Sequence, residues 1–191
     1  MDPSTPTPSE RYVLESQIRE CFGRCVYTHK THEQMADLFS DRLWWTKWTQ
    51  IVLSALTTGG AIGTLFDRSN VLYPYATATL SIAALIVNSY AKDLNPGASA
   101  QKHRETASDI WNVREAYLSL LADTRDEKIT PDALRKRRDE LQAQLYKIYR
   151  SAPHTNGKAY GRAQDRLQNK QDLTFSDGEI DHFLPTSLKR G

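Results

Sequence analysis

The sequence lacks most of the features by which common functional classes are recognised. Its formal net charge is only +2, because 25 basic residues nearly balance 23 acidic ones, whereas a dedicated nucleic-acid-binding domain carries a clear basic excess. It has 2 cysteines, too few for a scaffold built on disulfides. It contains no glycine-rich phosphate loop, no HExxH zinc motif and no nucleophile elbow. We therefore expect no nucleic-acid partner, no cofactor and no enzymatic activity.

Charge is also absent from two long stretches. Residues 48–66 and 69–91 contain no Asp, Glu, Lys, Arg or His, and only Asp67 and Arg68 lie between them. Soluble proteins intersperse their charges, at about a quarter of all residues. The segregation therefore indicates two segments that span a membrane.

Both stretches are long enough to cross a bilayer. At about 1.5 Å per helical residue, residues 48–66 would extend about 28 Å and residues 70–91 about 33 Å, against a hydrocarbon thickness of about 30 Å. Helices are expected because lipid offers the backbone no hydrogen-bond partners. The sequence predicts a two-helix transmembrane hairpin over residues 44–92, with the lipid bilayer as a partner. The alternative is a hairpin buried inside a soluble helical bundle.

The flanks of the hairpin indicate its anchors and its orientation. Aromatic rings with a polar edge favour the headgroup boundary, and the predicted interface anchors are Trp44, Trp45, Trp48, Tyr73, Tyr75 and Tyr90. The basic residues that flank the hairpin are Lys30, Arg42, Lys47, Lys92, Lys102 and Arg104, whereas the turn holds only Arg68. Positive charge stays on the cytoplasmic side, so both termini are expected in the cytoplasm.

Small and hydroxyl-bearing residues recur within both spans. Small side chains let helices approach closely, and polar faces can line a water-filled path once several copies assemble. The candidates for helix packing or pore lining are Ser54, Ala55, Thr57, Thr58, Gly59, Gly63, Thr64, Thr77, Ser81 and Asn88. The alternative is that the hydroxyls bond their own helix or a neighbour. Two helices cannot enclose a pore, so conduction would require a homo-oligomer.

The remaining sequence predicts an all-α protein with long amphipathic cytoplasmic helices. We expect a disordered start at residues 1–9, without the pattern of a signal peptide, and a helix over residues 10–43 that leads into the membrane. Residues 97–170 are expected to form a cytoplasmic helical bundle, with a helix starting at Thr130-Pro131 as N-cap and first position. Residues 171–191 form a C-terminal tail.

Two clusters of reactive side chains have modest interpretations. Cys21, Cys25, His29 and His32 lie along one helical face and are zinc-ligand types, but four ligands on one straight helix cannot surround a tetrahedral ion. We therefore predict no metal site, and two reduced cysteines typical of a cytoplasmic compartment.

A basic run is the second cluster. The residues that could contact phosphates or lipid headgroups are Arg135, Lys136, Arg137 and Arg138. Acidic residues follow at once, and consecutive residues point around a helix, so a solvated face is the favoured alternative.

The order of these elements resembles the SLATT family, the two-transmembrane effector domains associated with SMODS and SLOG proteins. The resemblance rests on DRLWWTKWTQIVLSAL, where a long helix enters the hairpin, and on the following helix KHRETASDIWNVREAYLSLL. It also rests on SAPHTNGKAYGRAQ and GEIDHFLP near the C-terminus.

The resemblance implies an effector of a prokaryotic anti-phage or conflict system. Such a protein would lie in the bacterial inner membrane and oligomerise to form a pore or otherwise breach the membrane. A nucleotide-synthesising or nucleotide-sensing partner encoded nearby would trigger it, and growth arrest or death of the infected cell (abortive infection) would follow. The alternative is a membrane-anchored helical adaptor that recruits a partner without opening a pore.

Overall fold

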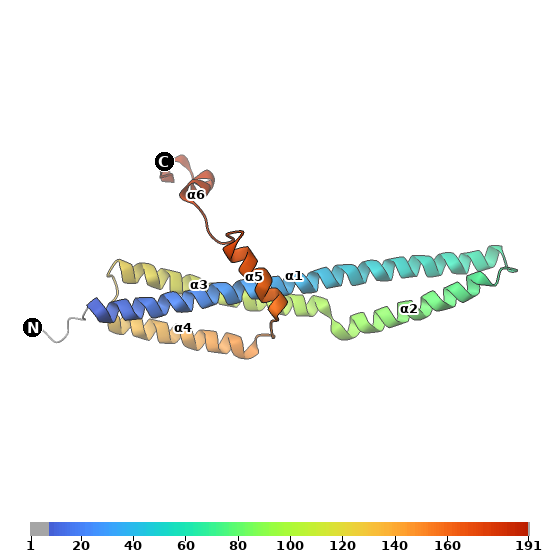
Figure 1. Ribbon diagram of the computed structural model, residues 1–191, viewed down its shortest axis with the longest axis horizontal. Helices are drawn as coiled ribbons and strands as arrows, with labels where there is room; N and C mark the ends of the chain where they lie inside the picture. Colours follow the sequence, from blue (N-terminus) through green and yellow to red (C-terminus); the bar gives the residue numbers. More distant parts are fainter. Residues whose placement is uncertain (1–7, 191) are drawn as a thin grey trace, which may run out of the picture.

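The computed structural model describes residues 8–190. All regular secondary structure in that range is helical. This confirms the all-α prediction. The molecule is elongated, with one long helix running through almost its whole length (Figure 1). Residues 1–7, most of the predicted disordered start, lie outside the described range, and Pro8 and Ser9 already belong to the first helix.

Helix α1 (Pro8–Phe66) is continuous through 59 residues. It starts at a proline, which suits the first turn of a helix, and no further proline occurs before Pro74. The predicted helix over residues 10–43 therefore runs without a break into the first apolar stretch. Movement of one half of α1 is mechanically coupled to the other half.

Helix α2 (Leu72–Leu94) returns alongside the second half of α1 (Figure 1). The turn between them is short, and Asn70 Oδ1 accepts the backbone N–H of Leu72 at 3.0 Å. A Cβ added to Gly60 would lie 2.4 Å from Thr77 Oγ1, and one added to Gly63 would lie 2.8 Å from the Tyr73 ring. Two glycines thus allow α2 to approach α1 closely.

Asn95 separates α2 from helix α3 (Pro96–Arg125). It adopts a left-handed conformation with φ 35°, which asparagine tolerates better than most residues. Its backbone ends α2, and its side chain accepts the N–H of Ala98 at the start of α3. The helix is therefore interrupted at this one residue, with almost no loop between α2 and α3.

The first half of α1 forms a three-helix bundle with α3 and α4 (Pro131–Ser151) (Figure 1). Thr130 caps α4 by accepting the N–H of Ala133, and Pro131 occupies the first turn, as predicted. The largest fully buried side chains in this core are Ile18, Ile110, Tyr117, Leu134 and Leu141. Ile110 and Tyr117 on α3, like Leu134 and Leu141 on α4, are seven residues apart, about two helical turns, so each pair lies on one face of its helix.

Helix α5 (Gly157–Gln168) crosses α1 near the middle of the molecule, and Ala159 and Ala163 are buried in that crossing. Beyond it the chain forms the short helix α6 (Asp177–Phe183), followed by the 3₁₀ turn Thr186–Leu188. Figure 1 shows α6 standing away from the bundle. The predicted tail over residues 171–191 therefore contains local structure but no part of the core.

Candidate membrane arm and the polar cluster at its base

Residues 44–94, here called the apolar arm, carry their hydrophobic side chains on the outside. No residue between positions 37 and 95 is buried. The large side chains exposed in the middle of the arm include Ile51, Val52, Leu56, Ile62, Ile82, Leu85 and Ile86. Monomeric soluble proteins rarely expose a contiguous apolar patch above a few hundred Å², so this arm requires an apolar environment that the single chain does not provide.

Within residues 8–190, α1 is the helix whose length and hydropathy suffice to cross a membrane. Its spanning window lies outside the bundle core, unlike the buried core helix of a soluble protein. Helix α2 also has no charged residue before Lys92. Its role as a second span stays a prediction.

The three tryptophans cluster at the base of the arm. The ring centroids of Trp44 and Trp45 are 4.8 Å apart, and those of Trp44 and Trp48 are 5.8 Å apart. All three rings are about half exposed or more. Tyr75 and Tyr90 are also exposed, whereas Tyr73 packs against Gly63.

The candidate packing and pore-lining residues divide into two groups. Those half-buried on the side of α1 or α2 that faces the other helix are Thr57, Gly63, Thr64 and Thr77. Those exposed on the outer surface are Ser54, Ala55, Thr58, Gly59, Ser81 and Asn88. Ala55, Gly59 and Gly63 are therefore divided between the two groups, because each four-residue step rotates about 40° around a helix.

Most hydroxyls in the arm bond their own helix. Thr57, Thr58 and Thr64 each donate to the carbonyl four residues earlier, at 2.8, 2.9 and 3.0 Å. Thr77 Oγ1 is buried without a hydrogen-bond partner in the contact with Gly60. In a single chain, these three threonines are thus satisfied as the alternative interpretation predicts, whereas the buried hydroxyl of Thr77 is not.

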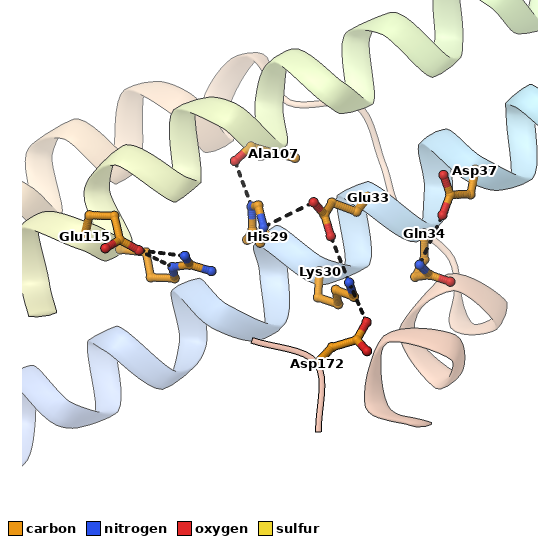
Figure 2. Close-up of polar contacts among 9 residues, drawn as sticks. His29, Lys30, Glu33, Gln34, Asp37, Ala107, Glu115 and Asp172 are labelled. Carbon is orange, nitrogen blue, oxygen red and sulfur yellow. Dashed lines mark hydrogen bonds and ion pairs between the residues drawn. The ribbon is translucent and has the colours of Figure 1, made fainter. Parts of the chain in front are cut away.

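A buried polar cluster lies below the arm, where α1 is enclosed by α3 and α5. His29 Nδ1 bonds the carbonyl of Ala107 at 3.0 Å (Figure 2). His32 Nδ1 and His103 Nδ1 are 2.9 Å apart, and both rings are buried. Burial lowers the pKa of His32 to about 4, with further lowering by His103 and His29, so this pair is neutral at pH 7 and acts as a hydrogen-bonded link between α1 and α3.

Lys30 is the centre of an ion network in the same cluster. Its Nζ lies 3.1 Å from Glu33 Oε2 and 2.8 Å from Asp172 Oδ2 (Figure 2). Burial lowers the pKa of Lys30, but the hydrogen bonds that Lys30 donates to Asp172 and Glu33 outweigh this effect and raise the pKa above its ordinary value. The hydrogen bond from Lys30 in turn lowers the pKa of Asp172. Both groups are charged at neutral pH.

The four candidate metal ligands on α1 point to different partners. Cys21 and Cys25 are reduced and buried in the bundle core, and His29 and His32 bond Ala107 and His103. Burial raises the pKa of Cys25 to about 11, so it remains a thiol. No group of three or more metal-ligating side chains is found in the described part of the chain.

The basic run on α4 is largely used inside the molecule. Arg135 pairs with Glu10 and Asp132, and Arg137 pairs with Glu140 at 2.9 Å. Arg138 pairs with Asp139 and also donates to Gln17. These contacts favour the interpretation of a solvated face that ties α4 to α1.

Sequence reasoning missed the polar cluster. It treated Lys30 as a flanking positive charge, whereas the structure buries that side chain. The sequence holds one weak signal, an unbroken polar run from His29 to Gln34 within a helix that is otherwise amphipathic. Nothing in the sequence connects this run to Asp172, which is 142 positions later in the chain.

Comparison with known proteins matches this architecture to one family. No curated protein and no solved structure shows significant similarity to the chain. The sequence model of the SMODS and SLOG-associating 2TM effector domain family 4 matches residues 14–179. These run from the first turns of α1 through α5 to the start of α6. The description of the family names an effector and no catalytic activity. The chain therefore belongs to the SMODS and SLOG-associating 2TM effector domain family 4, whose members are two-transmembrane effector domains of conflict and defence systems.

Proposed function

We propose that this protein is a membrane effector of a prokaryotic anti-phage system. It oligomerises in the inner membrane and forms a pore or perturbs the bilayer, so that growth stops or the infected cell dies. The observation that carries the proposal is the apolar arm, in which no residue is buried. Lipid supplies the apolar environment that the arm requires.

In this proposal both helices of the arm cross the membrane. Residues 48–66 of α1 and 72–91 of α2 correspond to about 28 and 30 Å of helix, close to the hydrocarbon thickness of about 30 Å. The exposed tryptophans then lie at the cytoplasmic interface. Lys47 and Lys92 flank the arm on that side, which supports cytoplasmic termini.

The outer surface of the arm supports the pore over general disruption. At about 100° per residue, Ser54 and Thr58 on α1 lie on the same side of the helix pair as Ser81 and Asn88 on α2, because the two helices are antiparallel. The opposite side is mostly apolar and includes Val52, Leu56 and Ile86. Several copies could therefore turn the polar side towards a shared lumen and the apolar side towards lipid.

A nucleotide-synthesising or nucleotide-sensing partner supplies the trigger in this proposal. The support is the family name, which associates these effectors with SMODS and SLOG proteins. Every helix in residues 8–190 belongs to the bundle, the arm, the crossing helix α5 or the tail, and none forms a separate sensor domain. We therefore place signal generation in the partner and membrane action in this chain.

The second candidate is a membrane-anchored adaptor that recruits its partner through the bundle. The observation that favours it is the satisfaction of Thr57, Thr58 and Thr64 within their own helix. An adaptor would keep its activity when the arm is replaced by an unrelated hairpin, whereas a pore former would lose it.

Induced expression in cells loaded with a membrane-potential dye tests the proposal. We expect depolarisation with the wild type, and its loss in the double variant S81L/N88L at equal membrane content. T79L is the matched control, because Thr79 is an exposed residue of α2 on the opposite side. Unchanged polarisation at a toxic level of the wild type would contradict a pore and support the adaptor.

A further inference from the structure

The segment that follows α5, residues 169–173, contacts α1 at Lys30, which lies 14 residues before the start of the apolar arm at Trp44. We infer that this segment is an autoinhibitory latch: the ion pair between Asp172 and Lys30 holds α1 in its resting position, and release of the pair permits the arm to change its tilt or assembly. The inference rests on the proposed function and specifies its regulation. The arguments are the burial of Lys30, the backbone around Asp172 and the place of the contact along α1.

The first argument is that Lys30 is buried and depends on Asp172. Only 11% of the Lys30 side chain is exposed, and lysine is almost never buried unless it is paired. Asp172 supplies the shorter of its two ion pairs, at 2.8 Å against 3.1 Å for Glu33. Without Asp172, the buried Lys30 ammonium group would have Glu33 as its one remaining carboxylate partner. The Lys30 side chain would then be more stable in contact with water than in its buried position.

The backbone on both sides of Asp172 is strained. Gln171 and Leu173, on either side of it, have φ angles of 54° and 69°. Residues with a Cβ rarely adopt this left-handed conformation, and such strain persists only where the surroundings enforce it. The N–H of Asp172 donates to the carbonyl of Arg166 at 3.0 Å, and Arg166 Nη1 lies 4.0 Å from its carboxylate. The turn is thus formed against the preference of its own residues, and the pair with Lys30 opposes its relaxation.

The latch contacts α1 at its most enclosed turn. From His29 to Ala36 every residue of α1 is buried except Glu33. On one side His29 and His32 bond α3, and on the other side Tyr27 stacks on Tyr160 of α5 with ring centroids 6.1 Å apart. Since α1 continues unbroken from this enclosed turn into the arm, a rotation of the turn is carried along the helix to the arm. Residues 169–173 thus cover Lys30 on the side of α1 that α3 does not contact.

The test compares Asp172→Asn with Asp165→Asn. Both changes remove one negative charge from the same region, but the Asp165 carboxylate contacts Asn169 and Lys170 and makes no recorded contact with α1. We expect D172N to depolarise cells at roughly a tenth of the protein amount that the wild type needs, as expected when a hydrogen bond between charged groups is lost. D165N should behave as the wild type.

A second variant, Gln171→Pro, removes the latch without a change of charge. Proline fixes φ near −65°, so the observed turn cannot form, and Q171P should reproduce the effect of D172N. Hydrogen exchange of the purified proteins in detergent gives a readout that is independent of the pore: residues 27–37 should exchange faster in D172N and Q171P than in D165N, while the core of α3 and α4 stays protected.

The outcomes separate the latch from the proposed function. Depolarisation by D172N and the wild type at the same protein amount, with the wild type active, would overturn the latch alone. Equal exchange of residues 27–37 in D172N and D165N would also overturn it. Depolarisation by no variant at any amount would overturn the pore, and the regulatory role of the latch with it.

Discussion

The two halves of α1 belong to the same helix but bury their apolar side chains in different ways. Between Leu14 and Ala36, the apolar residues face inwards, and the charged residues other than the buried Lys30 face outwards or are half-exposed. Between Trp44 and Phe66, the large apolar residues face outwards, and Gly60 and Gly63 face α2. The first half is folded by expulsion of water. The second half has its apolar surface where only lipid or other copies can cover it.

The largest difference between the two regions should appear on truncation of leucine. Leu141 in the bundle is fully buried, whereas Leu85 in the arm is 66% exposed. We expect L141A to lower the free energy of unfolding by about 2–5 kcal/mol, because it leaves a cavity, and L85A to change it by less than about 0.5 kcal/mol. Thermal unfolding in detergent measures both. Equal losses would mean that the arm is packed in a protein core.

A charged substitution should have the opposite pattern, with a larger effect in the arm than in the bundle. Leu56 in the arm and Leu118 in the bundle are exposed to similar extents, 53% and 48%. An arginine at the centre of a membrane span costs about 3 kcal/mol, whereas an exposed substitution in water costs little. We expect L56R to reduce the fraction of protein recovered in membranes and L118R to leave it unchanged. Identical fractionation would remove the distinction between the two exposed surfaces.

The close contact between α1 and α2 gives a smaller and more local effect. A Cβ at Gly60 would collide with Thr77 Oγ1, whereas a Cβ at Gly59 meets nothing within 4 Å. G60A should destabilise the arm by about 1–3 kcal/mol, as overpacking does, and G59A should not. Cross-linking between cysteines placed on the two helices, at equal expression, would report the separation. Insensitivity of the cross-link to G60A would show that α2 does not pack there.

The smallest expected effect is the pH dependence of the latch. The groups around Asp172 are Lys30 and Glu33 from α1, Arg166 from α5, and Lys170. The hydrogen bond from Lys30 lowers the pKa of Asp172 below the ordinary value of 3.8. Its stabilising effect is therefore fully present above about pH 5 and is lost as the pH falls through the lowered pKa. The thermal midpoints of the wild type and D172N should differ at pH 7 and converge once the pH has fallen below the lowered pKa of Asp172; a constant difference would contradict the assignment.

The elements predicted correctly from the sequence were those determined by local chemistry. The absence of proline between Pro8 and Pro74 explains the continuity of α1, and the Thr130-Pro131 cap explains where α4 begins. The polar cluster was not predictable, because the Lys30–Asp172 and His32–His103 pairs join residues far apart in the chain.

The orientation of α3 was only partly predictable. The sequence of this helix contains two adjacent apolar pairs, Ile110-Trp111 and Tyr117-Leu118. Ile110 and Tyr117 are buried, whereas Trp111 and Leu118 are exposed. Adjacent apolar residues leave the inward face of a helix ambiguous, and packing against α1 decides it.

The position of the turn between α1 and α2 tests the central claim most directly. The native Cys21 and Cys25 are buried, so a single added cysteine can be labelled with little background. Ser69 is exposed in the turn, and Ser119 is exposed on α3 in the bundle. A membrane-impermeant maleimide added to cells with a permeabilised outer membrane should label S69C before lysis and S119C only after lysis. Labelling of both variants only after lysis, with the protein recovered as a soluble monomer, would contradict a membrane-spanning arm.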